Sequence, residues 1–455
     1  MKSSIRFCVC IAAAAAAFAA GALAEAPNIY AIRGARLVTA TGAPIASGTL
    51  VIRNGMIEAV GADVQPPADA MVIDGAGMTA YPGLIDMGTS AGLDVQTPSQ
   101  PANFPTTEAQ ERWKRSVIFR PDVQVANHLQ PDSTDLARLA GAGITTVLST
   151  PPGSLVRGQS ALVNVAIAPD EPQIGAVADS RRGLNVVKTP VALHVSLGSP
   201  GGRGGYPVSL LGSIAFVRQH FLDAQHQLLE QQHYAKSKGA SGRPVYDPAL
   251  DALQPALARR LPVVFEAELS RDILRSLNMA KEFNLDPVIT GGREAYQIAD
   301  ELKARNVRVI YNLNYPTRPR TLAPDADEPV RALRERAQAS KTPAALEKAG
   351  VLFAFSSDGL REPRDFLRNA ARAVKDGLPA DAAIRALTIN AAKIAGADAQ
   401  LGSLERGKIA NVIVTDGDLF EERTRVRHVF VDGRLVEVEE APPQTGRGGR
   451  GRGGQ

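Results

Sequence analysis

Three carboxylates within apolar segments are the strongest candidates for chemistry in this chain. Glu266 and Glu268 stand two residues apart in the run "LPVVFEAE", and Asp358 ends the run "VLFAFSSD". Both runs have the composition of buried strands, and side chains two apart on a strand face the same side. Carboxylates that meet in one pocket can exchange protons with a bound molecule, so these three residues are candidate catalytic groups.

Three neighbouring carboxylates repel one another, and the sequence leaves open how that repulsion is relieved. The glutamates can pair with a basic side chain such as Arg293 or Lys188 and form a structural plug. With Asp358 they can instead form an all-oxygen site for a hard divalent cation such as Ca²⁺, Mg²⁺ or Mn²⁺. They can also lie exposed in a loop. Zinc is not expected, because the six histidines show neither H-x-H nor H-E-x-x-H spacing.

His194 and Arg203 are the candidate residues for binding a small molecule. His194 lies in the strand-like run "PVALHVSLG", and a packed, hydrogen-bonded histidine is the alternative. Arg203 lies at the tip of the glycine-rich run "LGSPGGRGGYP", where it can grip an anionic or peptide-like ligand; a solvated loop is the alternative. This run matches no phosphate-binding loop. The three histidines of segment 211–236, His220 among them, are expected on the surface.

The middle of the chain must position these residues, and it alternates short β-branched runs with amphipathic stretches. Strands are expected at 83–88, 144–150, 190–198, 261–268, 286–292, 308–314 and 351–359, with an eighth near 161–168. Helices are expected at 211–236, 270–284, 293–305, 343–349, 364–376 and 380–395. Asp381 is the expected N-cap of the last helix, and Gly350 is expected to end the helix before the last strand. Such β/α units predict the α/β class and a (β/α)₈ TIM barrel; an open doubly wound sheet is the alternative.

The flanking segments have a different pattern. Residues 25–80 and 403–440 alternate apolar and polar residues between turn signals. "RNGM" is expected to form a type I′ hairpin turn, and "VDGR" a second hairpin turn. Together the two segments predict one small β-sandwich. The barrel then occupies residues 81–402.

The first 24 residues have the pattern of a signal peptide. Lys2 and Arg6 precede an apolar run too short to span a bilayer, and a small-x-small cleavage site ends at Ala24. Both cysteines fall in this segment, so neither a disulfide nor a cysteine-ligated metal is expected in the mature chain. The expected location is the periplasm or the outside of the cell; a buried core helix is the alternative.

The formal charge of +4 lies at the two ends of the chain. The two basic residues of the signal segment and the three arginines of the tail 441–455 add five positive charges, so the body sums to −1 and nucleic acid is not expected to bind it. The Arg/Gly-rich tail is predicted to be disordered, although similar segments can bind single-stranded RNA. No later run approaches the ~18 apolar residues that a membrane helix needs, so no membrane contact is expected.

Three segments resemble the amidohydrolase superfamily. "YPGLIDMGTS" resembles its first-strand motif, Pro-Gly-Leu-Ile-Asp-x-His-x-His, and "FSSDGL" resembles its last-strand aspartate motif. "ALTINAAKIAGADAQLGSLERGKIANVIVTDGD" is similar to its usual exit from the barrel into the sandwich. Within the superfamily, 143–165 and 261–302 look most like secreted relatives of imidazolonepropionase. The resemblance covers about residues 29–438.

In that superfamily one or two divalent metals lie at the mouth of the barrel. Two histidines of the first strand, histidines of the fifth and sixth strands and the aspartate of the eighth hold them. By this resemblance Gly88 and Ser90 replace the first-strand histidines, Gly291 replaces the sixth-strand histidine, and the two glutamates occupy the region of the fifth strand. Only Asp358 matches. The resemblance therefore implies a hydrolase of C–N bonds, in non-peptide or cyclic amides, with most of its metal ligands replaced.

Losing the metal has a large energetic consequence. A bound metal lowers the pKa of water from 15.7 to about 7, which is on the order of 12 kcal/mol of nucleophile activation as an upper bound. Asp358 as a general base recovers about 10²–10⁴-fold in rate. Two hypotheses remain open: an exported hydrolase with a remodelled site, and a non-catalytic homologue. The second would bind a small molecule or act as a partner of an intact amidohydrolase or of its own copies.

Overall fold

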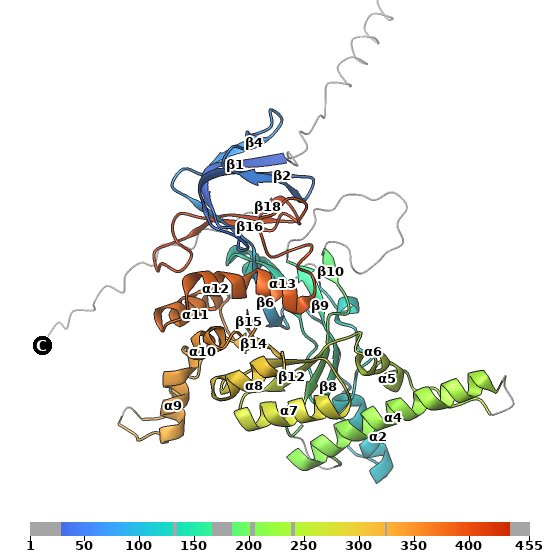
Figure 1. Ribbon diagram of the computed structural model, residues 1–455. Coiled ribbons are helices and arrows are strands. Elements are labelled where there is room, and N and C mark those ends of the chain that lie inside the picture. The colour runs from blue at the N-terminus through green and yellow to red at the C-terminus, as the bar shows by residue number, and fades with distance from the viewer. Residues whose placement is uncertain are drawn as a thin grey trace, which may run out of the picture.

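The computed structural model describes residues 29–130, 134–165, 184–200, 205–237, 242–323 and 325–436. The predicted signal peptide (1–24), the Arg/Gly-rich tail (441–455) and Arg203 lie outside these residues. Within them the chain has a mixed α/β fold whose strands form three sheets (Figure 1).

One sheet is built from both ends of the chain. Its strands are β1 (Ile29–Leu37), β2 (Ile45–Arg53), β3 (Met56–Gly61), β4 (Met71–Asp74), β5 (Thr79–Pro82), β16 (Val412–Thr415), β17 (Val426–Val431) and β18 (Arg434–Val436). They pair in the order β18-β17-β16-β5-β1-β2-β3, and β4 pairs with β1. The two ends of the chain meet where β5 and β16 run antiparallel.

Two hairpin turns of this sheet pack against each other. Asn54 and Gly55 have φ values of 50° and 81°, and Asp432 and Gly433 have 51° and 72°. Positive φ at both central residues is the mark of the expected type I′ turn. A Cβ added at Gly433 would lie 2.6 Å from the Cα of Gly55, so only glycine fits where the two turns touch.

The middle of the chain contributes the other two sheets. The first has the order β10-β9-β7-β6, from β6 (Leu84–Thr89), β7 (Ile144–Ser149), β9 (Ala161–Asn164) and β10 (Val186–Lys188). The second has the order β15-β14-β13-β12-β11-β8, from β8 (Val156–Gln159), β11 (Leu193–Ser196), β12 (Val263–Ala267), β13 (Pro287–Gly291), β14 (Arg308–Asn312) and β15 (Phe353–Ser356). Neighbouring strands from β11 to β15 run parallel, as do β6 and β7.

The described strands do not close into one hydrogen-bonded barrel. The segment expected as the eighth parallel strand forms β9 instead, which runs antiparallel to β7 and β10. β6 and β15 are in contact, but among the described residues no ladder joins them. The carboxylate of Asp86 crosses this gap and accepts hydrogen bonds from the backbone N and the Oγ of Ser357. The α/β class is therefore confirmed, whereas a barrel of eight parallel strands is not.

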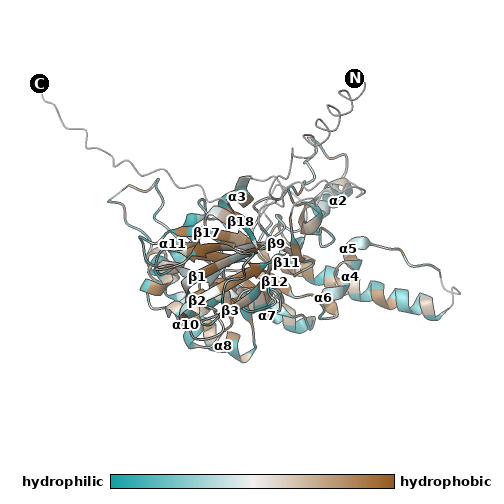
Figure 2. Cartoon of the chain, turned by 90° about the horizontal axis from the view of Figure 1, so that it is seen from above, coloured by the Kyte–Doolittle hydropathy of each residue, from teal (hydrophilic) through white to brown (hydrophobic). Residues whose placement is uncertain are grey.

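Helices cover the outer faces of the strands (Figure 1). They are α2 (Thr107–Ile118), η1 (Val125–Asn127), α3 (Thr134–Gly141), α4 (Leu210–Lys236), α5 (Pro248–Asp251), α6 (Gln254–Leu257), α7 (Ser270–Glu282), η2 (Ala295–Ile298), α8 (Ala299–Ala304), α9 (Val330–Ala339), α10 (Thr342–Lys348), α11 (Arg364–Lys375), α12 (Ala380–Leu387) and α13 (Ile389–Ala395). Figure 2 shows hydrophobic strands at the centre and helices with hydrophilic outer faces, and α4 reaches beyond the body in both views. None of the helices described here is long and apolar enough to cross a membrane.

Two helix boundaries differ from the expectation. The expected helix 380–395 is broken into α12 and α13 at Thr388, whose φ and ψ are −135° and −96°. The N-cap of α12 is Pro379, and Asp381 lies in its first turn instead, where a carboxylate still stabilises the helix dipole. The predicted stop at Gly350 is confirmed, because this residue has a φ of 70° and follows Ala349, the C-cap of α10.

His220 is not on the surface, as the sequence analysis expected. It is buried on α4, with ring centroids 4.0 Å from Phe119 and 4.2 Å from Phe216. Its Nδ1 lies 2.8 Å from the carbonyl oxygen of Phe216, and the Nε of Arg115 donates to its Nε2. This is a structural histidine, remote from the candidate carboxylates in the chain.

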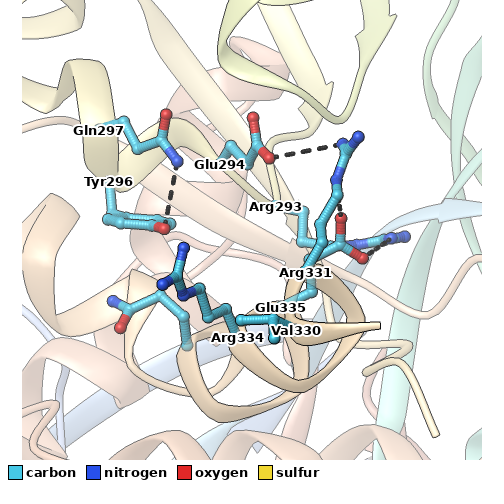
Figure 3. A pocket seen from close by; sticks show the side chains of 9 residues that line it. Arg293, Glu294, Tyr296, Gln297, Val330, Arg331, Arg334 and Glu335 are labelled. Atoms are coloured by element: carbon cyan, nitrogen blue, oxygen red, sulfur yellow. Dashed lines mark hydrogen bonds and ion pairs between the residues drawn. The ribbon is translucent and has the colours of Figure 1, made fainter. Parts of the chain in front are cut away.

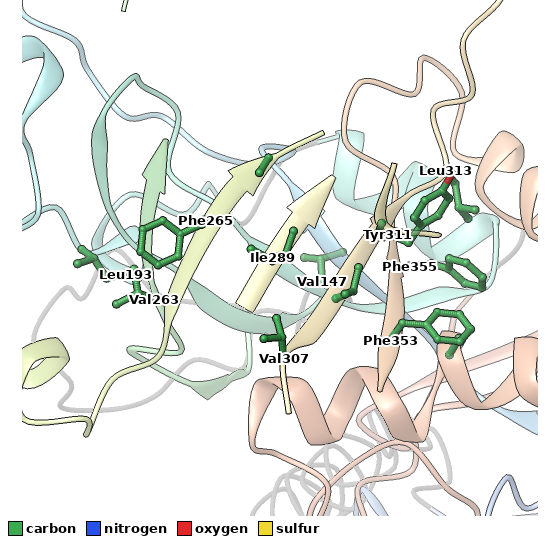
Figure 4. Close-up of a cluster of buried hydrophobic side chains, with 14 of the residues drawn as sticks. Val147, Leu193, Val263, Phe265, Ile289, Val307, Tyr311, Leu313, Phe353 and Phe355 are labelled. Carbon is green, nitrogen blue, oxygen red and sulfur yellow. The ribbon is translucent and has the colours of Figure 1, made fainter. Parts of the chain in front are cut away.

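The strands β12 to β15 separate two apolar cores. Val263 and Phe265 pack into the larger cluster, which faces the covering helices (Figure 4). Val264 belongs to a second cluster with Met87 and Val288. The alternation predicted for this strand is therefore confirmed, and it directs Glu266 and Glu268 toward the same side as Val264.

Candidate functional site

The candidate residues lie around one narrow pocket at the carboxyl ends of the parallel strands. It is lined by Met87, Gly88, Thr150, Arg157, His194, Glu266, Glu268, Thr290, Gly291, Ile310, Asn312 and Asp358. The strand register explains this convergence, because Glu266 pairs with Thr290 on β13 and with Ser196 on β11. The carboxyl ends of parallel strands are where active sites of such folds lie. The space inside is about 30 Å³, room for roughly two waters.

Each glutamate of the pocket faces an arginine. The Oε2 of Glu266 lies 3.2 Å from the Nη2 of Arg157 on β8. The Oε1 of Glu268 lies 3.6 Å from the Nη2 of Arg293, whose backbone N also donates to Oε2 at 3.2 Å. The pairing with Arg293, one of the alternatives left open by the sequence, is thus present. Lys188 is not a partner, because its Nζ donates to the backbone carbonyls of Ala395 and Gly396 at the end of α13.

The two glutamates are not equivalent. Burial raises the pKa of Glu268, Arg293 opposes this shift, and the neighbouring carboxylates Glu266 and Asp358 add to it. Glu268 therefore keeps a proton to a higher pH than an exposed glutamate. A carboxyl group of this kind can donate a proton to a bound molecule.

Asp358 is the carboxylate of the pocket that lacks a partner. It follows β15, its side chain is exposed, and it makes no ion pair or hydrogen bond with another described residue. It is therefore free to accept a proton from a water or a ligand in the pocket.

His194 is buried in the pocket wall, as the packed alternative requires, but without the hydrogen bonds that this alternative included. Its side chain is 2% exposed, yet neither ring nitrogen has a hydrogen-bond partner among the described residues. Burial, reinforced by Arg157, holds the pKa of the imidazole well below its usual value. At neutral pH the ring is uncharged, so it offers one donor and one acceptor.

Arg157 is the site residue that the sequence analysis missed. Its guanidinium is mostly buried beside His194, because β8 pairs with β11 and Gly158 stands opposite His194. The Nε has no partner among the described residues. A single arginine in the otherwise strand-like run "SLVRGQS" was the available signal, since a charged residue on a buried strand requires a partner.

Asp86 is a second missed residue, and its role is positional. It is fully buried and accepts from Ser357 N at 2.8 Å, Ser357 Oγ at 2.5 Å and Gly88 N at 3.1 Å. Burial, with a smaller contribution from Asp358, raises the pKa of Asp86 to about 7. The two hydrogen bonds from Ser357 tie β6 to the start of the loop that carries Asp358.

The residues present do not fit the superfamily's metal. Gly88 lies against β15, where a Cβ would be 3.2 Å from the Cβ of Ser356. Gly291 has a φ of +97°, and a Cβ there would be 2.9 Å from the Cδ of Glu268, so an imidazole cannot be accommodated without a backbone change. No group of three His, Cys, Asp or Glu side chains in the described part of the chain can hold a metal ion. The arginine partners of both glutamates also disfavour the hard-cation alternative.

Comparison with known proteins agrees with the resemblance of the last-strand motif and of the exit segment that follows it. The amidohydrolase family model matches residues 268–436. Amidohydrolase tasK of Hapsidospora irregularis is 25% identical in an alignment 410 residues long that covers 85% of this chain and 39% of that protein. The chain thus spans about two fifths of the length of this curated relative.

Solved structures show the same fold at low sequence identity. An amidohydrolase from Thermotoga maritima MSB8 superposes with a TM-score of 0.71 at 24% identity, covering 90% of this chain and 99% of that one. A prolidase complexed with N-methylphosphonate-L-proline has a TM-score of 0.53 at 19% identity, with 90% and 99% coverage. Residues 268–436 thus match the amidohydrolase family model, and the chain as a whole shares its fold with these solved structures.

Proposed function

We propose that this chain is an exported amidohydrolase-like hydrolase that cleaves a C–N bond of a small amide without the superfamily's metal site. The observation that carries the proposal is the meeting of Asp358, Glu268, Arg157 and His194 in one pocket at the ends of parallel strands. The family match and the hydrolase relatives support the reaction class. Export rests on the pattern of the first 24 residues.

Each of the four side chains has a separate role in amide hydrolysis. Asp358 removes a proton from a water molecule whose oxygen attacks the carbonyl carbon. The unpartnered Nε of Arg157 donates to the oxygen on which negative charge develops. Glu268, with its raised pKa, gives a proton to the leaving nitrogen as the C–N bond breaks. The products are a carboxylic acid and an amine, and neutral His194 holds the amide by its donor and acceptor.

The expected rate is modest. A general base contributes about 10²–10⁴-fold, and one oxyanion donor contributes about 10²–10³-fold. Together these give about 10⁴–10⁷-fold, at the low end of the ~10⁶–10¹⁷-fold accelerations of enzymes. The proposal therefore predicts a slow enzyme that chelators do not inhibit.

A second candidate is a non-catalytic homologue that binds an amide or partners an intact amidohydrolase. It is favoured by a specific observation, the neutralisation of Glu266 by Arg157 and of Glu268 by Arg293. Paired charges satisfy each other and reduce the reactivity of the carboxylates toward a ligand. In this candidate the pocket binds its ligand without turnover.

A comparison of amide hydrolysis by the wild type and by Asp358→Asn distinguishes the hydrolase from the non-catalytic homologue. The purified mature chain is incubated, with and without a chelator, with N-acyl amino acids, dipeptides and cyclic amides, and the amine released is quantified. The proposal predicts slow, chelator-resistant hydrolysis that falls about 10²–10⁴-fold in Asp358→Asn. The exposed Asp63→Asn is the matched control and should retain full activity. Hydrolysis by neither protein supports the binding candidate instead, and equal hydrolysis by wild type and Asp358→Asn would contradict the role of Asp358 as the general base.

A further inference from the structure

A second, larger groove lies beside the central pocket, between η2 and α9 (Figure 3). Its space is about 270 Å³, against about 30 Å³ in the central pocket. The charged and aromatic residues of its lining are Arg293, Glu294, Tyr296, Arg331, Arg334 and Glu335. Both walls follow parallel strands, η2 after β13 and α9 after β14, so the groove opens on the same face as the pocket.

Four ion pairs between arginines and glutamates connect the groove to the central pocket. The Nη2 of Arg331 lies 3.7 Å from the Oε1 of Glu294, and its Nε lies 3.1 Å from the Oε1 of Glu335. The Nη1 of Arg293 lies 3.8 Å from the Oε2 of Glu335, and its Nη2 lies 3.6 Å from the Oε1 of Glu268. Within this chain of contacts every arginine already has two carboxylates to satisfy it.

Arg334 is the positive charge that remains. It makes no ion pair or hydrogen bond with another described residue, and its side chain is exposed. Figure 3 shows its guanidinium directed toward the hydroxyl end of Tyr296, which accepts a hydrogen bond from Gln297 at 3.2 Å. A guanidinium free to make two parallel hydrogen bonds is suited to a carboxylate.

We propose that this groove is a binding site for a small molecule with a single carboxylate, separate from the central pocket. Arg334 holds the carboxylate, and the apolar part of the ligand lies against Tyr296 and Val330, which is 60% exposed at the groove. A monoanion is favoured over a phosphate-like dianion because Glu294 and Glu335 line the same groove and repel further negative charge. The site is independent of the proposed hydrolysis, since none of these residues takes part in it.

Calorimetric titration of the full chain with 3-phenylpropanoate tests the site. This probe has a carboxylate and an aromatic ring but no C–N bond, so its binding does not depend on catalysis. We expect saturable binding that weakens about 10-fold or more in Arg334→Met. The neutral analogue 3-phenylpropanol and inorganic phosphate should bind at least 10-fold more weakly than the acid. Arg406→Met, an exposed arginine in the turn before β16, should bind like wild type.

A second variant distinguishes a direct contact from a loss of structure. Glu335→Gln removes a negative charge that lines the groove and repels the carboxylate of the ligand, so the affinity for 3-phenylpropanoate should rise about 3-fold or more. No saturable binding, equal binding by Arg334→Met and wild type, or equal affinity for the acid and the neutral analogue would each overturn the proposal. So would a loss of binding in Arg157→Met with none in Arg334→Met, because it would place the probe in the central pocket.

Discussion

At the scale of single residues, the site is defined by which charges are paired. Glu266 and Glu268 each face an arginine, whereas Asp358 and the ring of His194 have no described partner. The orientation of the glutamates follows from strand alternation and was predictable. The pairing of Arg157 with Glu266 was not predictable, because it depends on two strands, β8 and β12, that lie about a hundred residues apart in the chain and flank β11.

The raised pKa of Asp86 predicts how the free energy of unfolding depends on pH. Burial and Asp358 raise the pKa of Asp86 to about 7 in the native state, against about 3.9 in an unfolded chain. Between about pH 4 and pH 7 the folded state holds a proton that the unfolded state has released, so the free energy of unfolding decreases as pH rises through this window. Asp86→Asn removes this contribution. The stability of Asp86→Asn relative to wild type should therefore increase by about 1–3 kcal/mol from pH 5 to pH 8.

Denaturant unfolding at the two pH values measures this difference. The variant Asp63→Asn changes an exposed aspartate and should show no such dependence on pH. A stability of Asp86→Asn relative to wild type that stays constant from pH 5 to pH 8 would show that Asp86 of the wild type is ionised over this range, which contradicts the raised pKa.

At the scale of elements, the strands were predictable and their partners were not. The run "LPVVFEAE" predicted β12 within two residues at each end, because β-branched residues between turn signals favour one conformation. The direction of β9 and the break of α12 and α13 at Thr388 depend on contacts distant in sequence, which local pattern does not contain. The same holds for His220, whose burial comes from the approach of α2 and α4.

The substitution Gly291→Ala tests whether the end of β13 requires a residue without a side chain. Its φ is +97° and a Cβ would meet Glu268 at 2.9 Å, so Gly291→Ala should lower the free energy of unfolding by about 1–3 kcal/mol. Gly141, at the end of α3, has no positive φ, and a Cβ added there would have no neighbouring atom within 4 Å. Gly141→Ala should change stability by less than about 1 kcal/mol in either direction. Equal effects of the two substitutions would contradict this account of β13.

At the scale of the whole molecule, a buried polar network joins the terminal sheet to the central strands. The Nδ2 of Asn411 donates to the Oγ1 of Thr146 at 2.9 Å and to the Oδ1 of Asn164 at 2.8 Å. The backbone N of Asp432 donates to the Oδ1 of Asn411 at 2.8 Å, and Asn164 donates to the carboxylate of Asp432. The sequence predicted strands from both chain ends but contained no sign of this network, since its members are far apart in the chain.

Asn411→Ala should therefore destabilise more than one part of the molecule. Three hydrogen bonds are lost in a buried setting, which corresponds to about 2–4 kcal/mol, and amide exchange should accelerate in β7 and β9 as well as β17. The exposed Asn103→Ala is the matched control and should leave both measurements within about 0.5 kcal/mol of wild type. Faster exchange confined to β16 and β17 would show that the two sheets are not coupled through Asn411.

The central proposal is that the pocket holds arginine-paired glutamates and no metal ion. Calorimetric titration of the chelator-treated protein with Zn²⁺, and separately with Mn²⁺, tests it most directly. The account predicts no stoichiometric binding tighter than about 10 µM and no rise in the unfolding temperature, since RT ln(1 + [L]/Kd) is small for a weak ligand. One equivalent bound at nanomolar affinity, lost in Asp358→Asn, would contradict it.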